Sequence, residues 1–162
     1  MSKTKIMWRI NLGGGGSLEL SHVKDMRGFE SSWSPDKSTI AFSRREKYGS
    51  AKELIYLIDS KGGSERILTE GSSPVWSPNG SNIVFISNNE KDIYTIDKDG
   101  SNLTLLLSHN EPINKVSYSP DGKWLIFSSG SYKSRIYFFG PGNWLFQLNI
   151  EGEASYPSWY QD

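Results

Sequence analysis

A four-residue anchor recurs along this chain at nearly constant spacing. It reads Trp-Ser-Pro-Asp at 33–36, Trp-Ser-Pro-Asn at 76–79 and Tyr-Ser-Pro-Asp at 118–121, and a degenerate Trp-Tyr-Gln-Asp stands at 159–162. The first residues of these anchors are 43, 42 and 41 positions apart. A period of roughly 20 to 50 residues is typical of repeat proteins, whose units bury their faces by stacking on neighbours. We therefore expect the chain to consist of stacked units of one kind.

Each unit contains short apolar runs that are rich in β-branched and aromatic residues and are bounded by Gly, Pro, Asn or Asp. This pattern favours strands and leaves no room for helices. Four strands in a unit of about 40 to 45 residues are the signature of a β-propeller blade. We predict an all-β protein, a β-propeller of four-stranded antiparallel blades, in which the anchor aromatics form the stacking surfaces. The runs that follow the anchors are 40–42, 55–56 and 66–69; 83–85, 93–94 and 103–107; and 125–127, 136–137 and 144–148.

The repeats also resemble those of a known family. The units FESSWSPDKSTIAFSRR, SSPVWSPNGSNIVFISNN and NKVSYSPDGKWLIFSSG are similar to the repeat of TolB-like (WD-repeat-like) propellers, which also occurs in tricorn proteases and prolyl oligopeptidase relatives. The resemblance implies the fold and is nearly silent on activity, because the family includes periplasmic protein-binding modules, protease-gating propellers and a few polysaccharide lyases. Members usually close with about six or more blades, so the repeat count here is low.

The two ends of the chain are expected to be partial blades of a single propeller domain or propeller fragment. Residues 5–21 read as a third and a fourth strand, and blades follow at about 29–70, 72–109 and 114–150. Residues 155–162 read as the first strand of a further blade. Unpaired strand edges invite pairing with another chain. Two alternatives therefore stay open: the chain is a piece of a larger propeller, or two copies complete one another as a homodimer.

The composition limits partners and chemistry. The 18 basic and 18 acidic residues give zero formal charge, which provides no overall field for nucleic acid or an anionic membrane, and no run is apolar enough for membrane insertion. Without cysteine the chain has no disulfide or thiolate chemistry. The start of the sequence lacks the apolar core of a signal peptide. The compartment stays open: periplasmic or extracellular if a signal peptide was trimmed, and cytoplasmic otherwise.

No set of residues predicts catalysis. The two histidines, His22 and His109, each follow a fourth strand, and no serine lies in a Gly-x-Ser-x-Gly elbow. The stretch 97–102 lacks the further oxygens of a calcium loop and reads as a hairpin turn. We expect no metal and no cofactor, and interpret both histidines as solvated or turn-capping. The alternatives are a polysaccharide lyase, which the resemblance permits, and a purely structural part of a larger propeller.

The loops between second and third strands are the most distinctive surface. The loop at 44–52 is longer than its counterparts at 87–91 and 129–134 and carries a net charge of +3. Function collects on loops, and Arg and Tyr are enriched at interfaces. An ordinary solvated loop is the alternative reading. We predict a non-enzymatic module that binds a protein or peptide, or assembles with itself, at a rim comprising Arg44, Arg45, Lys47, Tyr48, Asn88, Asn89, Tyr132, Lys133, His22 and His109.

Overall fold

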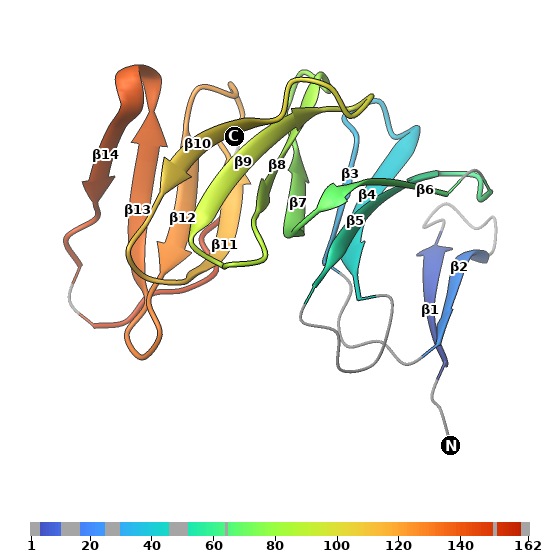
Figure 1. Ribbon diagram of the computed structural model, residues 1–162, viewed down its shortest axis with the longest axis horizontal. Helices are drawn as coiled ribbons and strands as arrows, with labels where there is room; N and C mark the ends of the chain where they lie inside the picture. Colours follow the sequence, from blue (N-terminus) through green and yellow to red (C-terminus); the bar gives the residue numbers. More distant parts are fainter. Residues whose placement is uncertain are drawn as a thin grey trace.

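The computed structural model describes residues 4–10, 17–24, 30–45, 52–63, 65–150 and 152–159. Within these residues the protein is all-β, with fourteen strands, one short 3₁₀ turn and no α-helix. Three antiparallel sheets contain four strands each, and the two remaining strands pair with each other. Figure 1 shows the sheets following one another in an open arc, with β1 and β2 at one end and β14 at the other. The predicted fold class is confirmed.

Each four-stranded sheet is a simple meander, which we call a blade. Blade 1 consists of β3 (Glu30–Trp33), β4 (Thr39–Arg44), β5 (Leu54–Asp59) and β6 (Arg66–Glu70). Blade 2 consists of β7 (Ser72–Trp76), β8 (Asn82–Ile86), β9 (Asp92–Asp97) and β10 (Thr104–Ser108). Blade 3 consists of β11 (Ile113–Tyr118), β12 (Leu125–Ser129), β13 (Arg135–Gly140) and β14 (Trp144–Gln147), with the 3₁₀ turn η1 (Pro141–Asn143) before β14. The separate pair is β1 (Thr4–Ile10) and β2 (Ser17–Lys24).

The turn between the first and second strands has the same side-chain network in every blade. In blade 1 the Ser34 hydroxyl donates to Asp36 Oδ1 at 2.6 Å and accepts from the Thr39 N–H at 2.9 Å. Serine and Asx side chains favour such turns because they satisfy backbone groups that the strand ladder leaves open. The same bonds recur in blade 2 at Ser77, Asn79 and Asn82, and in blade 3 at Ser119, Asp121 and Trp124.

The turns of successive blades also touch. The Pro35 ring lies 3.5 Å from the place that a Cβ on Gly80 would occupy, and the Pro78 ring lies 3.4 Å from the same place on Gly122. Gly80 and Gly122 have φ values of 70° and 72°. In blade 1 this turn position is held by Lys37, whose φ is 60°. Because side chains rarely adopt left-handed φ, the turn of blade 1 carries backbone strain that the other two avoid.

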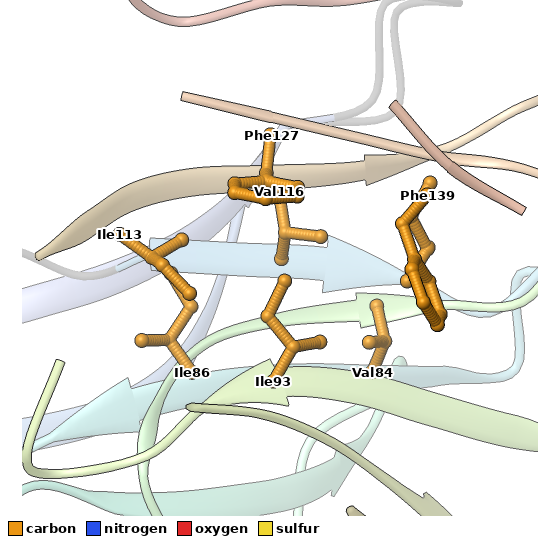
Figure 2. Packing of buried hydrophobic residues seen from close by; sticks show 8 residues of the cluster. Val84, Ile86, Ile93, Ile113, Val116, Phe127 and Phe139 are labelled. Carbon is orange, nitrogen blue, oxygen red and sulfur yellow. The ribbon is translucent and has the colours of Figure 1, made fainter. Parts of the chain in front are cut away.

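The core lies between the blades, where the face of one sheet packs on the next. Along each central strand the apolar side chains point alternately to the two faces of the sheet. Each blade therefore packs one set of apolar side chains against the preceding blade and the other set against the following blade. Figure 2 shows the layer between blades 2 and 3. Val84, Ile86 and Ile93 of blade 2 meet Ile113, Val116, Phe127 and Phe139 of blade 3 there.

The anchor aromatics differ in their burial. Trp76 is only 6% exposed and packs with Ala41 and Leu57 of blade 1. Trp33, which holds the same position in blade 1, is 43% exposed. Ahead of β3 the described residues supply only β1 and β2, whose Leu20 packs against β4 and β5. The pair β1–β2 thus takes the place of the outer half of a preceding blade, and among the described residues no inner half lies beside Trp33.

Residues 152–159, where a first strand was predicted from residue 155, have irregular backbone instead. A strand needs a neighbouring ladder, and in the described part of the chain no second strand lies beside this segment. Trp159 still stacks on blade 3, with its ring edge-on to Phe138 at 5.8 Å and its indole N–H 3.5 Å from the Ser117 carbonyl. Trp159 therefore packs against blade 3, as expected for the anchor of a further blade, although no strand forms around it.

Candidate binding site at the loop face

A pocket of about 560 Å³ lies at the end of the blades where their first strands begin. Residues of the β4–β5, β8–β9 and β12–β13 loops contribute to its walls, together with the segment 152–159. We call this end of the molecule the loop face; it includes the loop that joins β12 to β13 in Figure 1. All three blades contribute to the pocket, so its shape depends on how they stack.

The pocket lining is acidic and rich in hydroxyl groups. No lysine or arginine belongs to it among the residues that the structure describes. Carboxylates and hydroxyls together suit a ligand that donates hydrogen bonds and carries positive charge. The polar lining comprises Glu30, Glu53, Glu90, Ser43, Ser72, Ser73, Ser131, Ser134, Ser155, Asn114 and Tyr156.

A contact between two blades positions Glu53. The Glu53 N–H donates to Asn88 Oδ1 at 2.9 Å, and Asn88 Nδ2 donates to the Glu53 carbonyl at 3.2 Å. Asn88 belongs to the β8–β9 turn that also carries Glu90. In this turn Asn89 Oδ1 accepts from the Ser87 hydroxyl, as in the Ser-Pro-Asp turns. The amide side chains of Asn88 and Asn89, both predicted as rim residues, therefore hold the loop rather than face the pocket.

Glu30 joins the first strands of three blades. The Ser73 hydroxyl of β7 donates to its Oε2, and Nζ of Lys115 in β11 lies 4.0 Å from its Oε1. Glu30, Ser73 and Lys115 are 43 and 42 positions apart, the spacing of the repeat itself. Equivalent positions of the three blades thus converge at one carboxylate.

Two arginines of the predicted rim, Arg44 and Arg45, pair with glutamates. The guanidinium carbon of Arg44 lies 3.8 Å from the centre of the Tyr56 ring, and Arg44 forms an ion pair with Glu65. The Arg44 side chain is only 17% exposed. Arg45 Nε donates to Glu53 Oε1 at 3.0 Å. Arg44 therefore packs on its own blade, and Arg45 offsets part of the negative charge of the pocket.

Tyr132 and Lys133 of the predicted rim also fall outside the pocket lining. Tyr132 is 96% exposed and Lys133 is exposed, while Ser131 and Ser134 on either side of them line the pocket. His22 lies in β2, where its backbone is paired with Ile6. Its side chain, together with Lys47 and Tyr48, lies outside what the structure describes.

His109 is engaged in the connection from β10 to β11. Its Nδ1 lies 2.9 Å from the Ser129 hydroxyl, and its ring meets two aromatic rings of blade 3 edge-on. The Ser129 hydroxyl is also 3.1 Å from the Glu111 carbonyl and 2.9 Å from that of Pro112. Ser129 is 2% exposed. The Ser129–His109 pair therefore holds the β10–β11 connection in place, and its buried hydroxyl is not accessible to a substrate.

Sequence reasoning identified the loops that carry the pocket but missed its glutamates. A signal for Glu30 was present in the sequence. It stands three residues before its anchor, as Ser73 and Lys115 stand before theirs, and the first strands start close together in a propeller. Glu53 and Glu90 had no comparable signal. Their place depends on the inter-blade contact of Asn88 and on the length of each loop.

Two further properties concern the described residues alone. They contain no group of three His, Cys, Asp or Glu side chains arranged to hold a metal ion. They also contain no helix with the length and apolar character needed to cross a membrane.

Two curated proteins are similar to the chain over about three quarters of it. The uncharacterized peptidase YuxL of Bacillus subtilis is 31% identical over 171 residues, which cover 79% of this chain and 25% of that protein. An uncharacterized protein of Agrobacterium fabrum is 33% identical over 136 residues, which cover 76% of this chain and 44% of that protein. The chain thus spans less than half the length of either relative. No protein-family model matches it.

A solved structure assigned as TolB from Agrobacterium tumefaciens is similar to this one with a TM-score of 0.72. The sequences are 25% identical, and the match covers 90% of this chain and 55% of the other. The arc of blades described above is therefore an arrangement known from solved propellers.

Proposed function

Because the chain has a TolB-like β-propeller fold, we propose that it is a non-enzymatic module that binds a protein or peptide segment at its loop face. The observation that carries the proposal is the pocket of about 560 Å³, lined by three glutamates and six serines. Bonds between blades hold its walls, namely those from Glu53 to Asn88 and from Ser73 to Glu30. A preorganised wall lowers the ordering cost of binding, which supports a recognition role.

The charge of the lining supports a cationic ligand group. Arg45 pairs with Glu53 and Lys115 lies near Glu30, whereas Glu90 stands exposed on the β8–β9 turn. A lysine or arginine of the ligand would meet carboxylates and hydroxyl acceptors together. We therefore expect peptides containing lysine or arginine to bind more tightly than acidic peptides of the same length.

A pentapeptide array probed with the purified protein tests this function. Sequences containing lysine or arginine should be enriched among the bound spots, and the signal should fall as salt is raised. Glu90→Gln should weaken binding about three- to tenfold, since it removes one charge from the lining. Glu70→Gln is the matched control, because this exposed glutamate of β6 lies outside the pocket lining. Enrichment of acidic peptides, or equal losses in both variants, would contradict the proposal.

A second candidate is a propeller segment that accompanies a peptidase. The similarity to YuxL favours it, because that protein is called a peptidase and the chain corresponds to a quarter of its length. Both candidates take a peptide ligand and differ in whether cleavage follows in the same molecule. The purified chain should not hydrolyse fluorogenic peptides, since its Ser129–His109 pair is closed. Turnover by the chain alone would contradict both candidates, because each gives this chain a non-catalytic role.

A further inference from the structure

Two pockets lie where blade 1 meets blade 2, at the end of the blades that carries the Ser-Pro-Asp turns. We call this end the turn face. It is opposite the loop face, because successive connections of an antiparallel meander alternate between the two ends of the sheet. The pockets have volumes of about 400 and 200 Å³. Both are lined by Thr39, Trp76 and Lys98, and Arg66 also lines the larger one.

The indole N–H of Trp76 has no hydrogen-bond partner among the described residues. Trp76 is only 6% exposed, and its indole nitrogen is buried. A buried donor that has lost water without gaining an acceptor costs about 1–3 kcal/mol, and native structures leave few of them. Because Trp76 lines both pockets, an oxygen atom of a ligand held there would supply the acceptor.

The next junction solves the same problem with the chain's own residues. Between blades 2 and 3 the anchor is Tyr118, whose hydroxyl donates to Asn82 Oδ1 at 3.1 Å. Asn82 begins the second strand of blade 2, and Thr39 begins the second strand of blade 1. Trp76 therefore lies beside Thr39 as Tyr118 lies beside Asn82, but without the bond. The missing acceptor is specific to the junction of blades 1 and 2.

Two cations that the repeat does not require line the larger pocket with Trp76. Arg66 begins β6 and Lys98 directly follows β9, and Arg66 Nη2 donates to the Lys98 carbonyl across the junction. In the next blade along, Thr104 holds the position of Arg66 in the strand pairing, and Pro141 follows β13 as Lys98 follows β9. These two positions therefore carry positive charge at the first junction and none at the second.

The carboxylates near these cations are bound by their own turns. Asp36, Asp59 and Asp99 each accept the backbone N–H two residues further along, at 3.0, 2.7 and 2.9 Å. Within the part of the chain that the structure describes, the Lys98 ammonium forms no hydrogen bond or ion pair, and the Arg66 guanidinium forms only its bond to the carbonyl. The site thus has donors to offer.

We propose that the junction of blades 1 and 2 binds a small ligand through an oxyanion, either a carboxylate or a phosphate group. The exposed cations Lys98 and Arg66 attract the anion, and the guanidinium has further N–H groups for its oxygens. The indole N–H of Trp76 is the third donor, deeper in the junction. All lining residues lie between positions 34 and 99, so the site is formed by contacts internal to blades 1 and 2 and is separate from the peptide site proposed at the loop face.

Nuclear magnetic resonance of the ¹⁵N-labelled protein tests the proposal. The chain has six tryptophans, and through-bond assignment identifies the indole N–H signal of Trp76. Inorganic phosphate and succinate are titrated separately, with chloride adjusted to keep the ionic strength constant. At least one of them should shift the Trp76 indole signal in a saturable manner, because that N–H gains an acceptor. The anion that saturates at the lower concentration identifies the group the site prefers.

Lys98→Gln and Arg66→Gln should each weaken this binding about three- to tenfold, since each removes one exposed charge from the site. Lys133→Gln is the matched control, because this exposed lysine lies at the loop face and its loss should leave the titration unchanged. Circular dichroism checks that each variant has folded. The proposal is overturned if neither anion gives a saturable shift of the Trp76 signal. It is also overturned if either Lys98→Gln or Arg66→Gln leaves the affinity unchanged, or if Lys133→Gln weakens it as much.

Discussion

The guanidinium of Arg44 stacks on the ring of Tyr56, with its carbon 3.8 Å from the ring centre, and pairs with Glu65 at the same time. Arg44→Ala should therefore lower the free energy of unfolding by about 1–2 kcal/mol, through the lost cation–π contact and the lost packing of the side-chain stem. Urea unfolding measures this. Arg45→Ala removes a more exposed pair and should cost less than about 0.5 kcal/mol. Equal losses would mean that the stacking on Tyr56 adds no stability.

Lys37→Gly should stabilise the protein by about 0.5–1 kcal/mol, because it relieves a left-handed φ of 60° in the first turn of blade 1. The reciprocal change Gly122→Lys should cost at least as much, since φ there is 72°. Thermal unfolding of both variants checks the sign. If both shifted the melting temperature in the same direction, the argument from backbone strain would fail.

The aspartates in these turns make the stability of the protein depend on pH in the acid range. The hydrogen bond from the Ser34 hydroxyl, joined by bonds from Ser38, lowers the pKa of Asp36 from 3.8 to about 2. The Ser119 hydroxyl lowers the pKa of Asp121 in the same way. A depressed folded-state pKa contributes stability that is fully present above pH 3.8 and is lost as pH falls toward 2.

Replacing both carboxylates removes this dependence. The double variant Asp36→Asn, Asp121→Asn should resemble the unsubstituted protein at neutral pH, because Asn79 already makes the same bond in blade 2. Between pH 4 and 2 it should lose less stability than the unsubstituted chain, as followed by urea unfolding at a series of pH values. Asn79→Asp is the converse control and should steepen the loss. Parallel pH profiles for all three proteins would contradict the assignment.

Ser129→Ala should destabilise the protein by about 1–3 kcal/mol, because it removes a buried hydroxyl that serves the Glu111 and Pro112 carbonyls and His109. Peptide binding at the loop face should persist under conditions in which the variant remains folded. The two readouts are guanidinium unfolding and the peptide array. A variant of unchanged stability would show that this hydroxyl does not fasten the connection.

The fold was predictable because its determinants are local and repeated. A serine, a proline and an Asx residue at the same place in three turns set both the turn and the register of the strands that follow. Trp159 shows the limit of this reasoning. Its anchor role depends on packing against Phe138 and is present, whereas the strand expected around it needs a neighbour that local sequence does not specify.

The pocket was less predictable, because it depends on the directions of side chains and on contacts between blades. Arg44 belongs to a long charged loop in the sequence, yet alternation along β4 directs it to the side of Phe42 and Tyr56. Glu30 and Ser73 are 43 positions apart and meet only because their blades stack. The charge and length of the loops in the sequence therefore pointed to the loop face. The residues that line its pocket could be identified only from the stacked structure.

The contact of Pro35 with Gly80, repeated between Pro78 and Gly122, bears on how such a protein can evolve. Each unit recognises the one before it through the same small surface, so a duplicated unit would find a fitting neighbour on both sides without any compensating mutation. Tandem duplication within the gene could then change the number of blades in a single event. Divergence would afterwards be confined to the loops, where each new copy is free to acquire its own specificity.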